Sequence, residues 1–262
     1  MRRTALITGG SSGIGLALSR RLAKRGWRLL WVSLDEAELS AAAQSVRDDQ
    51  PNAEIEMLAL DLSKPGAARD VLDWAGRHGA VQLLVNNAGF GAYGPSAELA
   101  VETEAGMIAL NVCGLHAMTR AFLKPMDQAG GGTIVNIASN SAFTPAPRLA
   151  VYAATKAFVK HYSEALGEEL AEAGSAVRVM TVCPAAVSDT PFKTRAAMDR
   201  VRTFTSFTAT TADEVARDIL KGLDKKKRFV VTGAAMRRAM VLMKLSPAGL
   251  VRWLTRRETG QL

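Results

Sequence analysis

Short runs of apolar and β-branched residues recur along the chain and predict strands. Such side chains pack well on a pleated sheet, and polar or glycine-containing segments separate the runs. Seven runs show the pattern, and they are Ala5 to Thr8, Arg28 to Ser33, Glu54 to Leu60, Leu83 to Asn86, Thr133 to Ala138, Val177 to Cys183 and Arg228 to Thr232.

Segments with helical spacing of their apolar residues lie between these strands. Apolar side chains recur at i, i+3 and i+4 in Leu16 to Arg25, Asp35 to Arg47, Ala67 to Arg77 and Ala153 to Ala173. Strands that alternate with helices are joined by right-handed crossovers, which place helices on both faces of a parallel sheet. The sequence therefore predicts an α/β fold with a doubly wound parallel sheet of about seven strands.

The connections indicate a single domain. No linker rich in Pro, Gly and Ser marks a boundary, so we expect residues 1–233 to form the main domain and residues 234–262 a helical extension of it. Asp61 to Gly66 and Pro184 to Thr211 are predicted loops. The second is long enough to cover a ligand, as functional loops of this length often do.

Composition narrows the class of protein. With 262 residues, 48% of them hydrophobic and 22% charged, the chain can bury a large core and is unlike a disordered segment. Cys113 and Cys183 lie far apart and the three histidines are scattered, so we expect neither a disulfide framework nor a metal site. Neither a signal peptide nor an uncharged apolar stretch of about 18 residues is expected. We expect a soluble, cytoplasmic protein.

Positive charge is concentrated near the end of the chain. The net charge is +8, yet the 42 residues from Lys221 onward hold eleven Lys and Arg against Asp224 and Glu258, a balance of +9. The preceding 220 residues are therefore close to neutral.

Glycines follow the first predicted strand directly. In TALITGGSSGIG, residues 4–15, the glycines Gly9, Gly13 and Gly15 stand between a strand and a helix, with Ser11, Ser12 and Ile14 among them. Glycines there permit a tight turn and a close approach of backbone to a pyrophosphate, which the helix N-terminus attracts. The spacing differs from G-x-G-x-x-G, and an ordinary glycine-rich turn is the alternative.

A tyrosine and a lysine stand one helical turn apart. Tyr152 and Lys156 lie in a strongly helical stretch, so both side chains project from one face. A phenol with pKa of about 10 is a poor acid or base at neutral pH, and an ammonium beside it stabilises the phenolate. Ser139, at the end of the fifth predicted strand, lies at the edge where parallel sheets bind ligands.

Together these residues resemble the short-chain dehydrogenase/reductase family. The resemblance covers about residues 4 to 190 and rests on Thr8 to Gly15, Asp61 and Leu62, Asn86 to Gly89, Asn111, Ser139, Tyr152 with Lys156, and Pro184 with Val187. It implies a single Rossmann-like domain that transfers a hydride between a nicotinamide cofactor, NAD(H) or NADP(H), and a carbonyl/alcohol pair.

The resemblance also implies roles for individual residues. Tyr152 would protonate the substrate oxygen, Ser139 would position it, and Lys156 would lower the pKa of Tyr152 and hold the nicotinamide ribose. Asn111 would anchor a water that links Lys156 to solvent, while Asn86 would tie neighbouring strands together. The residues expected to bind the cofactor are Gly9, Ser11, Ser12, Gly13, Ile14, Gly15, Ser33, Asp35, Asp61, Leu62, Asn87, Ala88, Gly89, Tyr152, Lys156, Pro184, Val187 and Thr190.

Two segments depart from the family's pattern. Pro184 is followed by Ala185 where relatives often have Gly, and the usual Thr is offset, with Ser188 and Thr190 flanking Asp189. After the second strand, Ser33 replaces the acid usual in NAD users, and Leu34 replaces the Arg usual in NADP users. Because Asp35 would disfavour a 2′-phosphate, we expect NAD(H) over NADP(H). The alternative is that Ser33 and a basic side chain from elsewhere in the chain hold the phosphate.

The function expected from these observations is that of an oxidoreductase acting on an apolar carbonyl or alcohol. Phe192, Met198, Phe204 and Phe207 in the long loop suggest a fatty acyl, steroid-like or aromatic ketone, and the resemblance implies a homo-oligomer (dimer or tetramer). A dinucleotide-binding regulator with little turnover is the alternative. A nucleic-acid binder is not expected, because the basic tail contains no groove-reading motif.

Residues 234–262 are expected to form two short basic amphipathic helices that break at Pro247. Met236, Met240, Met243, Leu250, Val251 and Leu254 fall at helical spacing among many arginines. We expect these helices to pack on the same molecule or on a sister subunit. Peripheral contact with an anionic membrane is the alternative.

Overall fold

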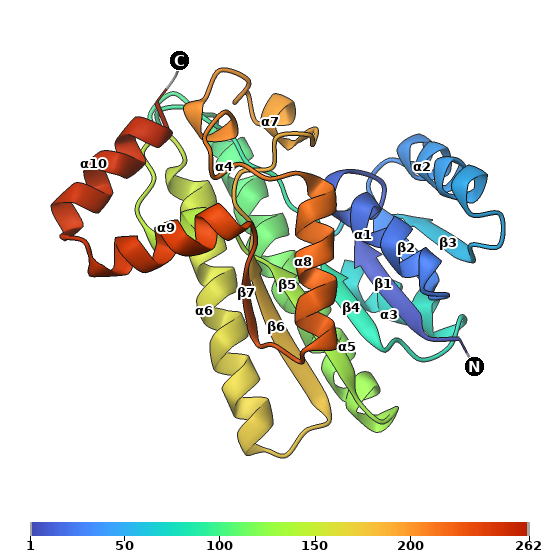
Figure 1. Cartoon of the computed structure of the whole chain (residues 1–262). Helices are drawn as coiled ribbons and strands as arrows, with labels where there is room; N and C mark the ends of the chain where they lie inside the picture. The colour runs from blue at the N-terminus through green and yellow to red at the C-terminus, as the bar shows by residue number, and fades with distance from the viewer. Residues whose placement is uncertain (1, 261–262) are drawn as a thin grey trace.

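The chain folds around one parallel sheet (Figure 1). The structure is a computed structural model that describes residues 2–260, except for the side chain of Lys244. The sheet has seven strands in the order β3-β2-β1-β4-β5-β6-β7. Their bounds are β1 Thr4–Thr8, β2 Arg28–Ser33, β3 Ile55–Ala59, β4 Leu83–Asn86, β5 Gly132–Ile137, β6 Val177–Cys183 and β7 Phe229–Val231. This is a Rossmann-like doubly wound sheet, and the predicted fold class is confirmed.

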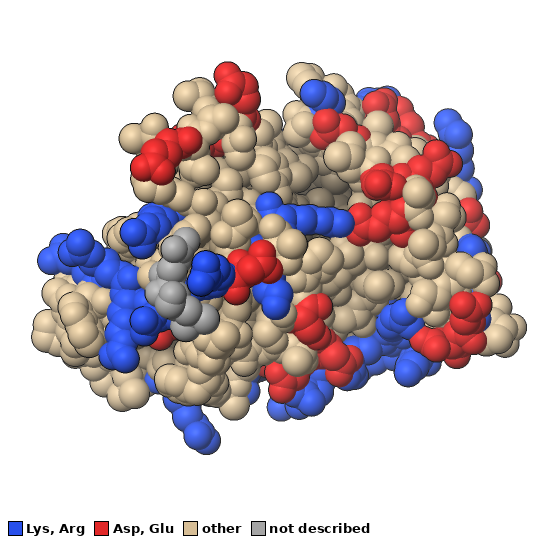
Figure 2. All heavy atoms as spheres, turned by 90° about the horizontal axis from the view of Figure 1, so that it is seen from above, with Lys and Arg blue, Asp and Glu red and all other residues tan. Residues whose placement is uncertain are grey.

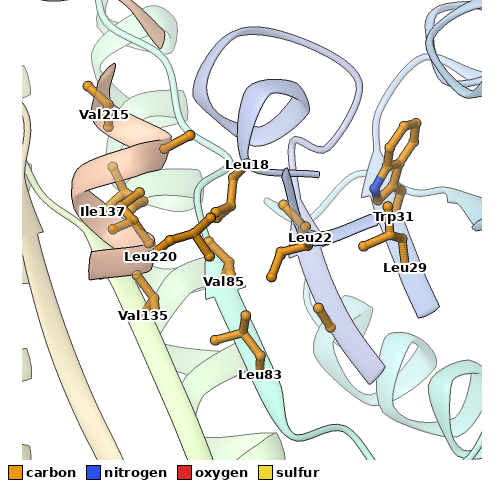
Figure 3. Close-up of a cluster of buried hydrophobic side chains, with 14 of the residues drawn as sticks. Leu18, Leu22, Leu29, Trp31, Leu83, Val85, Val135, Ile137, Val215 and Leu220 are labelled. Atoms are coloured by element: carbon orange, nitrogen blue, oxygen red, sulfur yellow. The ribbon is translucent and has the colours of Figure 1, made fainter. Parts of the chain in front are cut away.

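Helices cover both faces of the sheet. On one face, α1 (Gly13–Lys24), α2 (Glu36–Asp49) and α8 (Ala212–Asp224) bury their apolar residues, and Figure 3 shows Leu18 and Leu22 of α1 between strand and α8 side chains. On the other face lie α3 (Ala67–Gly76), α5 (Leu115–Gln128) and α6 (Ala150–Glu172).

Side chains that alternate between the two faces of each strand fill a hydrophobic core on each side of the sheet. Ile7 of β1 packs with α1, α2 and α8, whereas its neighbour Leu6 packs with α3 and α5, and both are fully buried. Trp31 and Val32 of β2 divide in the same way. Successive side chains of a strand point to opposite faces, so strands apolar at every position require helices on both sides.

The predicted strands agree with the structure to within about a residue at each end, but two helical regions were missed. One is α8, and the other is the continuous stretch formed by α4 (Val101–Ile108), a π-helical turn (Ala109–Gly114) and α5. By length and composition alone, Val101–Gln128 is apolar enough to cross a membrane, although it contains charged residues such as Glu104 and Arg120. However, Met118, Phe122 and Met126 of this stretch are buried against the sheet, as in a core helix.

The segment after β6 and the chain end hold the remaining elements. The segment 184–211, predicted as a loop, contains the short helix α7 (Phe192–Arg195) and a 3-10 turn (Arg202–Phe204). The two expected tail helices are confirmed as α9 (Ala234–Leu245) and α10 (Ala248–Glu258), separated at Pro247. They lie beyond β7 and α6, at one end of the molecule (Figure 1).

Candidate active site

A cleft of about 740 Å³ opens at the carboxyl ends of the strands. It runs from the loops after β1, β2 and β3, past those after β4 and β5, to the segment 184–211 and the tail helices. Figure 2, which looks down on this edge, shows the hollow in the upper face. Of the predicted site residues, those that line it are Gly9, Ser12, Gly13, Ile14, Ser33, Asp61, Leu62, Asn87, Ala88, Gly89, Ser139, Tyr152, Lys156, Pro184, Val187 and Thr190.

In the glycine loop after β1, residues 9–15, backbone packs directly against backbone. Gly9 has φ of +64° and Gly13 of +52°, a left-handed conformation that glycine adopts without strain. A Cβ on Gly15 would meet the carbonyl oxygen of Gly9 at 2.1 Å, so helix α1 can start this close only with glycine there. No side chain caps α1 at Ser12, which leaves its first N–H groups facing the cleft.

Asn87 and Thr8 hold the ends of β1 and β4 together under this loop. The Asn87 side-chain amide donates to the carbonyls of Thr8 and Gly9 at 3.0 and 3.1 Å, while Thr8 Oγ1 accepts from the N–H groups of Asn87 and Ala88. The neighbouring Asn86 donates to Asn136 Oδ1 on β5 at 2.8 Å, which confirms that it ties adjacent strands. The floor of the cleft is therefore fixed by paired polar groups.

Asp61 stands at the cleft wall after β3. Its carboxylate accepts from the N–H and hydroxyl of Ser63, at 2.9 and 2.6 Å, and these hydrogen bonds lower its pKa. The carboxylate is therefore ionised at neutral pH and held at the far end of the cleft from Tyr152.

Ser139, Tyr152 and Lys156 meet where β5 and α6 approach each other. Ser139 begins a 3-10 turn, in which its Oγ accepts from Ser141 N–H at 3.1 Å. Lys156 donates from Nζ to the carbonyl oxygen of Ile137 at 2.9 Å, and the same atom lies 5.9 Å from the centre of the Tyr152 ring. The one-turn spacing of Tyr152 and Lys156 on α6 thus delivers both side chains to one wall of the cleft.

Burial governs the proton affinities of this pair. It raises the pKa of Tyr152 to about 12, against an opposing hydrogen bond with Ser139. Burial also lowers the pKa of Lys156 to about 8. The net effect is a raised pKa, because removing the phenolate from water costs more than the Ser139 hydrogen bond offsets, and the expected lowering of the Tyr152 pKa by Lys156 stays a prediction. Tyr152 is a neutral phenol at physiological pH.

Asn111 lies behind the cleft, in the π-helical turn between α4 and α5. It is fully buried, its Nδ2 donates to the carbonyl oxygen of Phe90 at 2.9 Å, and its Oδ1 accepts from Phe90 N–H at 3.1 Å. A Cβ on Gly89 would stand 2.8 Å from Asn111 Oδ1 and 3.5 Å from Lys156 Nζ, so these groups are close neighbours. The Asn111 side chain fixes the segment 89–90 beside Lys156, and the expected water-anchoring role stays a prediction.

The segment after Pro184 places Thr190 rather than Ser188 in the cleft. Thr190 Oγ1 donates to the carbonyl of Val187 at 3.3 Å, and its methyl carbon would lie 3.2 Å from a Cβ on Gly13. Asp189 turns away and accepts from the N–H of Ala212 at the start of α8. Val187 and Thr190 thus face the glycine loop across the cleft.

Three predicted cofactor residues do not line the cleft. Asp35 instead caps helix α2, accepting from Glu38 N–H at 2.9 Å. Gly15 is buried beneath Gly9, and Ser11 lies behind Ser33, with 3.1 Å between their hydroxyl oxygens.

Glu38 and Arg195 were missed by the sequence analysis. Glu38 accepts from Ser11 at 3.1 Å and from Arg195 of α7 at 2.9 Å, while Arg195 also lines the cleft. Burial raises the pKa of Glu38, but hydrogen bonds from Ser12, Arg195 and Ser11 together with the Arg195 charge lower it overall. An ion pair therefore joins segments on either side of the cleft, over the end of β2.

Apolar side chains form the other end of the cleft. Phe192 lies against the Tyr152 ring, with 5.4 Å between ring centres. The tail helices, which sequence analysis did not connect with the site, complete this wall. Its apolar members are Ala146, Leu149, Phe192, Met198, Phe204, Phe207, Met236, Met240, Leu242, Met243 and Leu254.

Comparisons with known proteins agree with this geometry. Residues 3–200 match the family model described as short chain dehydrogenase. A putative ketoacyl reductase of granaticin polyketide synthase from Streptomyces violaceoruber is 36% identical over 198 residues, covering 73% of this chain and 70% of that protein.

Solved structures resemble the chain over nearly its full length. A short-chain dehydrogenase from Sphingobium yanoikuyae in complex with NADPH is 32% identical, with a TM-score of 0.79 and 95% of each chain covered. A short-chain dehydrogenase/reductase from Burkholderia phymatum in complex with NAD is 25% identical, with a TM-score of 0.84, covering 100% of this chain and 98% of that one.

Proposed function

Because the chain belongs to the short-chain dehydrogenase/reductase family of NAD(P)-dependent oxidoreductases, we propose that it interconverts an apolar ketone and its alcohol. The observation that carries the proposal is the placement of Ser139, Tyr152 and Lys156 in one cleft, between a glycine loop at one end and an apolar wall at the other. An intact set of this kind favours turnover over a purely regulatory role.

The glycine-loop end fits a dinucleotide. Uncapped N–H groups at the start of α1 attract a pyrophosphate, and Gly13, which faces Thr190 across the cleft, brings no side chain into its path. Asp61, Ala88 and Gly89 would contact the adenosine and ribose parts, and Lys156 the nicotinamide ribose. When bound, the cofactor supplies the hydride, so the protein must supply orientation and a proton.

Tyr152 is the proton donor in this proposal. With a pKa of about 12 its Oη keeps its proton at neutral pH, as an acid for ketone reduction requires. Ser139, hydrogen-bonded to the same phenol, would hold the carbonyl oxygen at hydrogen-bonding distance from Tyr152 Oη. Lys156, with a pKa of about 8, is mostly protonated at neutral pH and stabilises negative charge that develops on the phenol oxygen.

The apolar wall supports an apolar substrate. Phe192, Met198 and Phe204 project beside Tyr152 from the segment 184–211, and Met236 and Met240 close the wall from α9. Such a surface gains free energy by removing hydrocarbon from water and offers few partners to a charged substrate. A long-chain, steroid-like or aromatic ketone fits these surroundings.

A preference for NAD(H) is also part of the proposal, but it rests on Glu38 and Arg195 instead of Asp35. Glu38, ionised at neutral pH, is linked through Ser11 by two hydrogen bonds to Ser33, beside which the adenosine ribose would lie. Because Arg195 is already paired with Glu38, its charge is not available to bind a 2′-phosphate. Dissociation constants of NADH and NADPH, measured on one preparation, test this preference.

We also propose a cytoplasmic homo-oligomer. Ile108 of α4 and Phe158 of α6 are exposed on helices that contact each other, which provides an apolar surface for a sister subunit. Cys113 and Cys183 are unpaired, as in a reducing compartment. Sedimentation velocity tests the oligomeric state.

The experiment that tests the function replaces Tyr152 by Phe. We expect kcat/KM for ketone reduction to fall at least about a hundredfold, the usual contribution of a general acid, with the NADH dissociation constant within about twofold of wild type. Tyr162→Phe is the matched control, because this tyrosine also lies on α6 and its hydroxyl has no hydrogen-bond partner in the described part of the chain.

Substrate choice is measured on ketones of increasing hydrocarbon size together with a short keto acid. Activity of Tyr152→Phe close to that of wild type would contradict the role of the phenol. The highest kcat/KM on the keto acid would contradict the apolar substrate class.

A further inference from the structure

The tail helices α9 and α10 have inner faces that belong to the site. Met236 and Met240 are buried against Ala185, and Met243 lines the cleft. On α10, Thr255 Oγ1 lies 3.3 Å from Thr144 Oγ1, and the Thr259 carbonyl accepts from the Tyr93 hydroxyl at 2.6 Å. The tail is therefore a fixed wall of the cleft.

The outer faces of these helices expose apolar side chains instead of the expected polar ones. Among the described residues, eleven large hydrophobic side chains are exposed, and six of them fall between residues 241 and 254. They are Val241 at 61%, Leu242 at 66%, Leu245 at 81%, Leu250 at 46%, Trp253 at 56% and Leu254 at 37% exposure. A helix that packs one face on a soluble protein normally carries polar residues on the other, so this surface lacks a partner.

Unpaired arginines surround these side chains. Arg237 pairs with Asp218 at 3.0 Å, whereas no ion pair joins Arg238, Arg252, Arg256 or Arg257 to any carboxylate that the structure describes. Arg252, Arg256 and Arg257 line an open depression of about 570 Å³ on α10, together with Gly249 and Trp253. The Arg257 guanidinium lies 5.8 Å from the centre of the Trp253 ring. Basic side chains gather over this end of the molecule (Figure 2).

We infer that the outer faces of α9 and α10 dock on an anionic lipid bilayer. Arginines beside exposed Leu and Trp side chains match the boundary between phosphate headgroups and acyl chains. A nucleic acid would satisfy the arginines but leave the apolar side chains in water. A second copy of the chain joined by a two-fold axis would place this arginine-rich surface against itself, at a cost in repulsion.

The same surface reaches the proposed substrate site. Leu242 and Leu254 are exposed and also line the cleft, so apolar side chains extend from the outer surface of the tail to the wall beside Phe204. Resting on the proposed function, this continuity indicates that a lipid-like ketone enters from the bilayer without crossing water.

The experiment is co-sedimentation of the full chain with vesicles of phosphatidylcholine alone or with about one third phosphatidylglycerol, at physiological salt. We expect pelleting with the anionic vesicles and little with the neutral ones. Reversing three charges in Arg252→Glu, Arg256→Glu and Arg257→Glu should weaken the partition coefficient at least about tenfold, as should Leu245→Ser with Trp253→Ser.

The matched control reverses three exposed lysines at the opposite end of β7, in Lys225→Glu, Lys226→Glu and Lys227→Glu. It changes the net charge by the same amount and should leave the partition coefficient within about twofold of wild type. Equal losses in both triple variants, or equal binding to both kinds of vesicle, would overturn the inference. So would a wild-type dimer that the arginine variant dissociates, because the face would then bind a second copy.

A soluble ketone separates this inference from the proposed function. None of the substituted arginines lines the cleft, so each charge variant should reduce a water-soluble ketone at the wild-type rate. Vesicle binding without any turnover would leave the docking surface standing and count against the enzyme, and turnover without vesicle binding would do the reverse.

Discussion

The proton affinity of Lys156 gives a test of the site that needs no substrate. The residue is only 5% exposed, and its ammonium donates to the carbonyl oxygen of Ile137 without a carboxylate partner among the described residues. Burial lowers its pKa from 10.5 to about 8, since the charged form loses its hydration. Folding therefore carries an electrostatic cost that depends on pH.

The direction of that dependence follows from proton binding. Below about pH 8 the amine is protonated in both states, and the folded state bears the full cost. Between about 8 and 10.5 the unfolded chain binds more protons than the folded one, so the free energy of unfolding rises with pH. The whole difference corresponds to about 3 kcal/mol, of which about 2 kcal/mol appears between about pH 7 and about pH 9.5.

Urea unfolding of wild type and Lys156→Met at these two pH values measures the effect. Methionine keeps most of the chain length and removes the charge. Burial raises the pKa of Cys183 to about 12, which lowers stability at alkaline pH. Both proteins contain this thiol, so the subtraction removes its own burial effect and leaves only its interaction with Lys156. We expect the stability of wild type relative to the variant to rise by about 2 kcal/mol with pH. A change below about 0.5 kcal/mol would refute the buried, unpaired ammonium.

Two further substitutions test the cofactor end of the cleft. Glu38→Gln removes the carboxylate and frees Arg195, so the ratio of NADPH to NADH affinity, measured by fluorescence titration, should rise at least about tenfold, and Arg195→Gln should not raise it. Gly15→Ala would place a Cβ 2.1 Å from the Gly9 carbonyl and should abolish measurable cofactor binding, whereas Gly76→Ala, whose Cβ meets nothing within 4 Å, should leave it unchanged. An unaltered affinity ratio, or normal binding by Gly15→Ala, would contradict these assignments.

Local sequence patterns were sufficient for the elements that position the site. The strands around Leu6, Trp31 and Val135 are apolar runs between turn-forming residues, and the crossover rule then decides which edge holds Ser139 and the glycine loop. The i, i+4 spacing of Tyr152 and Lys156 likewise requires no tertiary information. In contrast, α4 and α5 were missed because the π-helical turn at Asn111 interrupts the regular spacing between them.

The pairing of Glu38 with Arg195 had no local signal. The two residues are 157 positions apart, and each alone is an ordinary charged residue on a helix. Asp35 was the more conspicuous candidate because it follows β2 directly, yet a carboxylate at the first position before a helix is the best acceptor for that helix's own N–H groups. Helix capping therefore competes with ligand binding for the same side chain, and the sequence position alone does not decide between them.

In the tail, residues that the sequence pattern assigns to one apolar face belong to two different faces. Met236, Met240 and Val251 are buried, as their spacing predicts, but Leu250 and Leu254, assigned to the same stripe, are exposed. Val241 and Leu245 form a second apolar row on the side of α9 opposite Met240. Helical periodicity identifies the residues that one face of a helix can bury. It does not show against how many other surfaces the helix packs. A helix that is apolar on two sides requires a second apolar surface to cover its outer side. Because the arginines beside that side have no carboxylate partners among the described residues, the covering surface is expected to be negatively charged.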